Sequence, residues 1–502
     1  MNIFKTPKKN KSFFSEEQYK KNINNGKLRF IEKRGDGFGA RMVSLLNAMY
    51  CSKKFHIPFA FVWFGDEKLN AFCRTKQVDN NRLVGISVGS PEEVFTENFI
   101  RNYCISDDGS NEEIIKMKDW VYYFEPYRDI ADFCFDDLLY YECRSPLGWN
   151  MPPIFLPDVF QDINKNDYKR VCKECYREIE FSDEIKGIIE KVDTAVSDKG
   201  KFITIHVRTG DIVYSVPWPM YLRKALIAEL VVEVIIKELP HNNVVVLGDD
   251  ITSLERIIQF SRQIMQENNI DFGNHSILLA KDLIENNTYE NVLLTFYDSY
   301  VLSKGEKLFI SSWSSFAFFP SLISDTDDVF SCYNYFSAQE QYDIILKYIE
   351  RLDLHPLQRS FSYYHLMQLS KELGKSFEEQ LIFANKMVSL SSLNVTKAVY
   401  AFFLIEHRKF NLFYDFVEAL SSEELEGMLK FAIIPWNSNC YRMNVFKRFC
   451  LGIFTADNAR KARLLHTIKK KLSAQEKEWF NQMYKTIFFR LHRYIWFNKK
   501  LH

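Results

Sequence analysis

The chain has no excess of charge of either sign, because its 65 Lys and Arg residues equal its 65 Asp and Glu residues in number. Without a net field to attract phosphates, this composition predicts no nucleic-acid partner. Long apolar runs are missing too, since none reaches the length of a bilayer-spanning helix. Residues 1–25 are rich in Lys and Asn and lack the apolar core of a secretory signal. These absences predict a cytoplasmic protein.

Cysteines at metal-ligand spacing are scarce. Of the ten Cys, only Cys172 and Cys175 form a CxxC pair, and neither a second pair nor a His at zinc-finger spacing accompanies it. Most of the others, such as Cys51 and Cys332, stand singly in apolar segments, where buried free thiols are found. We therefore expect no metal and no resident cofactor, and this cysteine usage suits a reducing compartment.

Aromatic residues are abundant, with 44 Phe and 26 Tyr. Such residues line carbohydrate-binding clefts, although they also simply fill protein cores. The length of 502 residues predicts two or three domains. The change from alternating strands and helices to helices alone places them at 26–165, 166–345 and 350–502. The first two are expected to be α/β domains and the third an all-α domain.

The most informative stretch is residues 202–211. A short apolar run over residues 202–207, bounded by a glycine turn, predicts a buried strand of a parallel sheet. The polar residues at its end then lie at the carboxyl edge, where open α/β sheets bind ligands; they are His206, Arg208, Gly210 and Asp211. Arg208 is the strongest candidate, since a guanidinium is always charged and binds phosphate through two hydrogen bonds.

A second candidate site lies near the N-terminus. Residues 28–32 predict a strand, residues 40–55 a helix with one apolar face, and residues 58–64 another strand, which together form a βαβ unit. The loop between strand and helix contains Asp36, Gly37 and Gly39. A glycine loop that opens a helix can bring backbone N–H groups to a phosphate or a substrate oxygen. A tight turn is the alternative, and the spacing is not that of a dinucleotide fingerprint.

The stretch after this unit is less regular until a second α/β pattern begins. A strand is expected at 120–124, a loop at 145–153 and a charged helical bridge at 160–199. Helices at 221–239, 254–266 and 291–303 then alternate with strands at 243–247, 276–279 and 307–311. The polar residues after these strands include Gly248, Asp249, Ser314 and Ser315, and they predict a Rossmann-like nucleotide site. Ordinary helix capping is the alternative for the serines.

From residue 350 onward the pattern is helical. Helix pairs are expected at 363–388 and 398–420, and residues 374–377 recur as residues 407–410, a separation of 33 that is close to a tetratricopeptide period. A tetratricopeptide-like array and a generic bundle both fit this pattern. Residues 482–502 predict a basic aromatic helix. It would either lie on the inner face of an anionic membrane as a peripheral contact or pack as a terminal helix.

Four sequence blocks, in order, resemble the fucosyltransferase superfamily, most closely its α-1,2-fucosyltransferases and their polysaccharide-synthesis relatives. The likeness covers residues 28–325. Residues 36–41 resemble the family's glycine-rich block, and residues 206–211 match its HxRxGD block. Residues 244–250 match a strand that ends in acidic residues, and residues 314–319 match a serine and aromatic block.

The resemblance implies a GT-B fold, in which two Rossmann-like domains face each other across a cleft. It also implies a metal-independent, inverting sugar transfer, usually of fucose from GDP-fucose. Arg208 would bind the donor pyrophosphate, and Asp249 would contact the nucleoside. His206 and Asp211 would shape the turn and touch the nucleotide. The remaining candidates for the donor site are Ser314, Ser315, Phe316, Gly37, Gly39, Arg41, Gly210 and Gly248.

The chain departs from the family pattern in three of the four blocks. Ala40 and Arg41 replace the family's Asn and Gln, although Arg41 can itself reach phosphate. Thr209 replaces a second Arg, and residues 318 and 319 are Phe where the α-1,2 enzymes have Trp. These departures leave the donor sugar and the linkage open. Residues 325–327 form a DxD pattern, but their place in a loop past the fourth block disfavours a metal-dependent transferase.

Three functional hypotheses follow. The first is a transferase that builds surface polysaccharide, such as O-antigen, capsule or lipopolysaccharide, on a glycan or lipid-linked glycan acceptor. Arg208, Arg41 and the helix start at Ser314 would stabilise the leaving diphosphate. Asp36 is the leading candidate for the general base, ahead of Asp211 and His206. The second is a transferase of the same fold with a different nucleotide sugar. The third is a catalytically inactive helical-repeat scaffold or binding protein.

Overall fold

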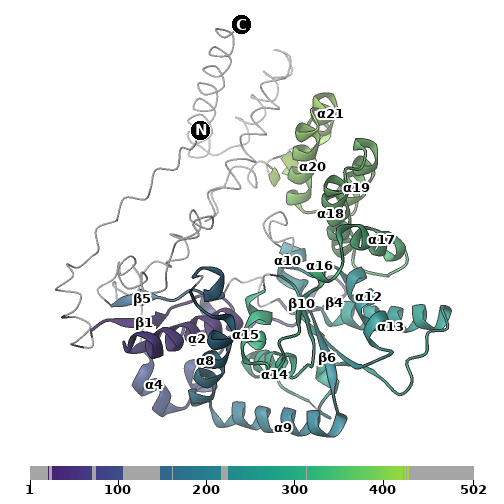
Figure 1. Cartoon of the computed structure of the whole chain (residues 1–502). Coiled ribbons are helices and arrows are strands. Elements are labelled where there is room, and N and C mark those ends of the chain that lie inside the picture. Colours follow the sequence, from purple (N-terminus) through teal and green to yellow (C-terminus); the bar gives the residue numbers. More distant parts are fainter. Residues whose placement is uncertain are drawn as a thin grey trace, which may run out of the picture. The chain divides into compact units, whose positions relative to one another are not determined.

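The computed structural model describes residues 27–69, 75–105, 147–160, 162–215, 224–285, 287–312 and 314–421, together with residues 21, 25, 423–425, 427 and 428. The chain divides into two compact units. The first contains the residues up to Gly210 and those from Arg223 to Tyr335; the second contains Asp211–Leu222 and the residues from Phe336 onward. The described part of the first unit holds two larger parallel sheets, and that of the second is helical (Figure 1).

The first sheet has three parallel strands in the order β2-β1-β5. The central strand β1 (Arg29–Glu32) lies between β2 (Phe59–Phe61) and β5 (Gly148–Asn150). Helix α2 (Phe38–Phe55) connects β1 to β2 and packs on β1. Its buried apolar side chains belong to a core that also includes residues of the second sheet. The predicted βαβ unit is therefore present, and its glycine loop follows the central strand.

Strand β5 lies in the stretch 145–153, where the sequence predicted a loop, so that prediction is wrong for Gly148–Asn150. The reason is Gly148, whose φ is +122° and whose Cβ position would lie 2.0 Å from the carbonyl oxygen of Arg29. Glycine alone permits this approach of two backbones. The residue that signals a turn in the sequence therefore allows β5 to pair with β1. The strand expected at 120–124 lies outside the described residues.

Shorter elements and two long helices complete this part of the unit. A hairpin of β3 (Gln77–Val78) and β4 (Asn81–Arg82) is followed by α3 (Pro91–Val94) and α4 (Glu97–Tyr103). The predicted helical bridge forms α8 (Lys165–Glu178) and α9 (Asp183–Lys199), which begin after the capping side chains of Asn164 and Ser182. Helix α8 packs on α2, and α9 packs on α14 (Asn291–Ser303), a helix of the second sheet.

The second sheet has five parallel strands in the order β10-β9-β6-β7-β8. The strands are β6 (Phe202–Val207), β7 (Asn243–Gly248), β8 (Ile277–Leu279), β9 (Leu308–Ile310) and β10 (Val329–Ser331). The chain adds β7 and β8 on one side of β6 and then β9 and β10 on the other. This is the doubly wound order, so the topological switch point lies between the carboxyl ends of β6 and β9.

The longer described helices between the strands of the second sheet form two pairs. Helices α12 (Ala228–Glu238) and α13 (Ile251–Glu267) pack together, and α14 (Asn291–Ser303) packs with α15 (Ser315–Ile323). Right-handed crossovers place these pairs on opposite faces. Helix α13 begins before the predicted residue 254 because the carboxylate of Asp250 accepts a hydrogen bond from the backbone N–H of Ser253 at 3.0 Å. The short α16 (Cys332–Tyr335) ends the unit.

The second unit consists of helices in its described part. After α10 (Gly210–Ser215), which starts at the unit boundary, they are α17 (Ala338–Tyr348), α18 (Pro356–Glu372), α19 (Phe377–Ser389), α20 (Asn394–Glu406) and α21 (Phe410–Ala419). The two predicted helix pairs are present, and the recurring segments form their turns, with positive φ at Gly374 and Arg408. A tetratricopeptide-like array stays a prediction. Residues 482–502 lie outside the described part, in which no helix has the length and apolar character to cross a membrane.

Candidate functional site

Arg208 and Ser314 meet at the switch point of the second sheet. Arg208 directly follows β6, and Ser314 lies between β9 and the first turn of α15. Nη1 of Arg208 donates a hydrogen bond to Oγ of Ser314 at 3.2 Å. The structure thus joins a guanidinium to the start of a helix, whose first N–H groups have no partner within the helix. Doubly wound sheets bind phosphates at this position.

The turn that carries Arg208 is held by Asp249, which follows β7. Oδ1 of Asp249 accepts hydrogen bonds from the backbone N–H of Thr209 at 2.8 Å and from its hydroxyl at 3.2 Å. A Cβ on Gly210 would lie 2.7 Å from Oδ2 of the same carboxylate. Gly248 lets β7 approach β6, because its Cβ position would lie 2.1 Å from the carbonyl oxygen of Val207. Asp249 therefore positions the backbone that follows Arg208, and Gly248 lies against the backbone that precedes it.

His206 is buried beneath the same turn. Its ring centroid lies 4.9 Å from that of Phe316, in the first turn of α15. Burial and the charge of Arg208 lower the pKa of His206 to about 3, so the ring is neutral at neutral pH. Its Nδ1 has no hydrogen-bond partner among the described residues. A neutral ring in this place can support Phe316 but supplies no positive charge to a phosphate. The side chain of Asp211, in α10, lies outside the described part.

The glycine loop of the first sheet reaches the start of α15. A Cβ on Gly39 would lie 2.4 Å from Cα of Phe316 and 2.6 Å from the carbonyl oxygen of Ser315. This space admits glycine only, and it allows α2 and α15 to pack together. All four sequence blocks are therefore linked by direct contacts, which are Gly39 with Phe316, Phe316 with His206, Arg208 with Ser314, and Thr209 with Asp249.

Asp36 is exposed in the glycine loop and forms a two-point ion pair with Arg34. Nε of Arg34 donates to Oδ1 at 2.8 Å, and Nη2 donates to Oδ2 at 2.6 Å. The loop therefore carries a second guanidinium, which the sequence analysis did not single out. The sequence feature that could have identified Arg34 is an arginine within a glycine loop at the end of a predicted strand. Gly37, beside this pair, lies against Ile86, whose Cγ2 is 3.5 Å from the glycine's Cβ position.

Arg41 lies in the core under the loop. Its Nε donates to the carbonyl oxygen of Asp36 at 2.8 Å, Nη1 donates to that of Phe64, and the guanidinium lies 5.1 Å from the ring centroid of Trp63. Burial lowers the pKa of Arg41, and the side chain has 0% exposure. In this position it supports the backbone of the glycine loop. The phosphate contact expected of Arg41 stays a prediction that would require the side chain to leave the core.

Glu32 is a second group that the sequence analysis did not single out. It ends β1 with 0% exposure, and its Oε1 accepts a hydrogen bond from the backbone N–H of Arg34 at 2.7 Å. Oε2 has no hydrogen-bond partner in the described part of the chain. Burial raises the pKa of Glu32 to about 8 even though the charge of Arg41 opposes the shift. The carboxyl group is therefore mostly protonated at pH 7. The sequence feature that could have identified Glu32 is an acidic residue at the end of an apolar strand.

The carboxylates of the DxD pattern form ion pairs with α8. Asp325 pairs with Lys173 at 3.2 Å, and Asp327 pairs with Lys169 at 2.6 Å. Cys172 and Cys175 are buried on the same helix, and burial raises the pKa of Cys175 to about 12. Among the residues that the structure describes, no three His, Cys, Asp or Glu side chains gather as metal ligands would.

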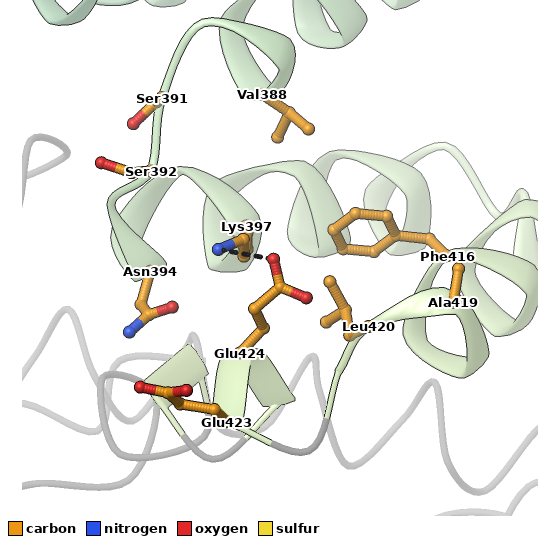
Figure 2. A pocket seen from close by; sticks show the side chains of 10 residues that line it. All are labelled: Val388, Ser391, Ser392, Asn394, Lys397, Phe416, Ala419, Leu420, Glu423 and Glu424. Carbon is orange, nitrogen blue, oxygen red and sulfur yellow. Dashed lines mark ion pairs between the residues drawn. The ribbon is translucent and has the colours of Figure 1, made fainter.

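The helical unit contains a separate cavity of about 540 Å³ (Figure 2). Inside it, Nζ of Lys397 pairs with Oε1 of Glu424 at 3.2 Å. The cavity combines hydroxyl, amide and charged groups with one aromatic ring, which suits a small polar ligand. Its lining residues are Val388, Ser391, Ser392, Asn394, Lys397, Phe416, Ala419, Leu420, Glu423 and Glu424.

Neither a protein-family model nor a curated protein matches the chain. Among solved structures, the fucosyltransferase NodZ from Bradyrhizobium is similar at 15% identity and a TM-score of 0.31, over 59% of this chain and 93% of that one. NodZ alpha-1,6-fucosyltransferase soaked with GDP-fucose is similar at 14% identity and a TM-score of 0.29, over 59% of this chain and 93% of that one. POFUT1 in complex with GDP is similar at 10% identity and a TM-score of 0.31, over 60% of this chain and 97% of that one. Likeness at this level carries no argument about function, which has to come from the site itself.

Proposed function

We propose that the chain is a glycosyltransferase that binds a nucleoside diphosphate sugar at the switch point of the second sheet. The observation that carries this proposal is the hydrogen bond from Arg208 to Ser314 at the carboxyl ends of β6 and β9. A fixed cation beside the start of a helix is an anion site. The contact of Gly39 with the start of α15 brings the other sheet's first loop to the same place, as a transferase of the GT-B type requires.

The reaction that fits this site is a single displacement. An acceptor hydroxyl oxygen forms a bond to the anomeric carbon of the donor, and the bond from that carbon to the phosphate oxygen breaks. The configuration inverts because attack and departure occur on opposite sides. The leaving diphosphate gains negative charge, which Arg208 and the N–H groups at the start of α15 would stabilise without a metal ion. Ser314 orients the guanidinium for this task.

The acceptor's proton has to reach a base, and Asp36 is the group proposed for it. Its side chain is exposed, so an acceptor can approach it, and Arg34 fixes the orientation of its two oxygens. Glu32 has an oxygen without a partner among the described residues but is fully buried. A hydroxyl group of an acceptor cannot reach Glu32 directly. The exposed carboxylate therefore meets the geometric requirement for a general base better than the buried one.

The resemblance of the four blocks is the basis for the proposed donor and acceptor. Fucose from GDP-fucose is the proposed donor, and a glycan of a surface polysaccharide, such as O-antigen, capsule or lipopolysaccharide, is the proposed acceptor. Synthesis on a lipid-linked glycan would take place in the cytoplasm, on the inner face of the membrane. Residues 482–502 would supply the peripheral contact with lipid.

The direct test is turnover of donors. The chain is incubated with GDP-fucose and with other sugar nucleotides, and released nucleoside diphosphate is measured for wild type, Arg208→Ala and Arg170→Ala. Arg170 is an exposed arginine of α8 that pairs with Asp167 and Glu174, so its variant controls for loss of a charge. We expect release from one donor, loss of it in Arg208→Ala and no change in Arg170→Ala. Release that survives Arg208→Ala would contradict the proposed site.

A second function is favoured by the cavity of the helical unit. In this alternative the α/β unit is inactive, and the chain is a scaffold that binds a polar ligand between α19, α20 and α21. The two functions differ in their response to nucleotides. A scaffold would release no nucleoside diphosphate from any sugar nucleotide and would bind none. A transferase with a different donor would release nucleoside diphosphate from a donor other than GDP-fucose.

A further inference from the structure

The segment Leu83–Ile86 crosses from the second sheet to the first at the carboxyl ends of their strands. At one end, Leu83 forms an antiparallel bridge with Asp250, and the backbone N–H of Val84 donates to the carbonyl oxygen of Asp249 at 2.8 Å. At the other end, Ile86 lies against Gly37 of the glycine loop. Four residues that none of the sequence motifs included therefore join the loops after β7 and β1.

The segment is clamped to α13 on its N-terminal side. The amide of Asn81, which is 2% exposed, donates to Oδ2 of Asp250 at 2.9 Å and to Oγ of Ser253 at 3.1 Å. Arg82 adds a backbone bond to Oγ1 of Thr252 at 2.9 Å and two side-chain bonds to Glu255 at 2.8 and 2.7 Å. Buried and two-point contacts of this kind fix the position of β4 on α13.

The C-terminal side of the segment is fixed by Asp66. Its carboxylate accepts hydrogen bonds from the hydroxyl of Ser87 at 2.7 Å and from the backbone N–H groups of Val88 and Gly89 at 2.7 and 3.2 Å. Between these two anchors, Val84 and Ile86 are half-buried. The segment is therefore held at both ends, and Ile86 also packs against the hydrophobic core. The exposed parts of Val84 and Ile86 are thus fixed in place, as in a preorganised binding wall.

The direction of a bound nucleotide follows from the sheet. With the diphosphate at the switch point between β6 and β9, the nucleoside extends toward the second strand of the doubly wound order, which is β7. Asp249 directly follows that strand, and its Oδ1 already accepts hydrogen bonds from Thr209. A nucleoside near this edge would therefore meet Val84, whose backbone is bonded to Asp249, and then Ile86.

We propose that Val84 and Ile86 form the wall of the site that packs against the nucleoside, so that they contribute to nucleotide affinity and to the choice of base. This inference rests on the proposed function. It separates two parts of the ligand: Arg208 and the start of α15 bind the diphosphate, and the segment Leu83–Ile86 binds what is attached to it. Inorganic pyrophosphate carries only the first part and is therefore the probe that tells the two apart.

The test measures dissociation constants by calorimetry for pyrophosphate and for GDP, UDP, CDP and ADP, with the full chain and with the variants Val84→Ala and Ile86→Ala. Val78→Ala is the matched control, because Val78 is a half-buried valine of the same hairpin outside the segment. Removing the apolar groups in Val84→Ala or Ile86→Ala should lower the affinity for the preferred nucleoside diphosphate by about tenfold. The affinity of these two variants for pyrophosphate should stay unchanged. Val78→Ala should change neither the affinity for the nucleoside diphosphate nor that for pyrophosphate.

Hydrogen exchange of the wild type gives a second measurement that needs no substitution. Amide exchange at Leu83–Ile86 should slow with the preferred nucleoside diphosphate and stay unchanged with pyrophosphate. The inference is overturned if the two alanine variants bind that nucleotide as wild type does, or lose pyrophosphate in equal measure. In both cases the proposed function stands as long as nucleotide binding needs Arg208. If the wild type binds neither pyrophosphate nor any nucleotide, the proposed function itself fails, and the inference fails with it.

Discussion

Arg208 donates a hydrogen bond to Ser314 although 106 positions separate them in the sequence. The bond fixes the guanidinium at the switch point, so both its charge and its shape should matter. Arg208→Ala is expected to weaken nucleoside diphosphate binding by about a hundredfold, and Arg208→Lys by about tenfold, because lysine keeps the charge but loses the two-point geometry. Calorimetric titration measures both. Equal affinities for the two variants and the wild type would exclude Arg208 from the site.

Gly39 should be the least replaceable residue of the glycine loop. An alanine Cβ would lie 2.4 Å from Cα of Phe316, in backbone that cannot rotate away, so α2 and α15 would have to separate. We expect Gly39→Ala to lower the free energy of unfolding by about 1–3 kcal/mol, as measured by urea denaturation. Gly187→Ala is the matched control, since it lies within α9 with nothing within 4 Å of its Cβ position. It should raise the free energy of unfolding by about 0.5–1 kcal/mol. A Gly39→Ala protein as stable as wild type would contradict the close packing of the two helices.

Glu32 should make stability depend on pH. Its pKa of about 8 in the folded protein exceeds the unfolded value of 4.5, so the folded state keeps a proton that the unfolded state has released. The free energy of unfolding should therefore fall as the pH rises from 4.5 to about 8, by up to about 1.4 kcal/mol per pH unit. Glu32→Gln removes the group that titrates and should flatten this part of the profile. Chemical denaturation at pH 6.5, 7 and 7.5 measures the difference.

His206 and Asp298 also contribute to the pH dependence of stability. The folded pKa of His206, about 3, lies below the unfolded value of 6.5, so its contribution rises with pH and opposes that of Glu32 up to pH 6.5. Above about pH 7.5 the histidine is mostly neutral in both states. Burial also raises the pKa of Asp298 to about 7, which adds a slope of the same sign as that of Glu32. The contribution of Glu32 is therefore the difference between the wild-type and Glu32→Gln profiles. Parallel profiles of wild type and Glu32→Gln from pH 6.5 to 8 would show that the carboxyl group is not buried as described.

Asp36 should affect turnover more than binding if it accepts the acceptor's proton. Asp36→Asn keeps the shape of the side chain and removes its basicity. We expect it to lower kcat by about a hundredfold or more while nucleotide affinity changes little. Arg34→Ala is the companion variant, because it removes the partner that orients Asp36 without removing the base. A loss of nucleotide affinity equal to the loss of kcat in Asp36→Asn would assign the residue to donor binding instead.

The strands and helices of the α/β unit could be predicted where a short apolar run meets a polar or glycine-containing end. Residues 202–207 form β6 and residues 291–303 form α14, both with the predicted bounds. Gly148 misled the prediction because a glycine that signals a turn and a glycine that permits close strand pairing look alike in a sequence. Only the position of Arg29 beside it separates the two cases.

The sequence could predict which loops form the candidate site, but it could not predict the contacts between their side chains. Parallel strands place their carboxyl ends at one edge, so the sequence could place Arg208 and Ser314 together. The burial of Arg41 and Glu32 depends on how α2 packs, which local pattern does not reveal. Segment Leu83–Ile86 carries no polar motif at all. Its place beside Asp249 and Gly37 comes from long-range bonds such as that of Asn81 with Asp250.

Binding of nucleoside diphosphates tests the central claim most directly. Thermal unfolding of wild type, Arg208→Ala and Arg170→Ala is followed with saturating GDP, UDP, CDP and ADP. A ligand that binds the folded state at a hundred times its Kd adds about 2.7 kcal/mol of stability. The account predicts that one nucleotide raises the Tm of wild type and of Arg170→Ala and leaves that of Arg208→Ala unchanged. If no nucleotide raises the Tm of the wild type, the switch point of the second sheet is not a nucleotide site.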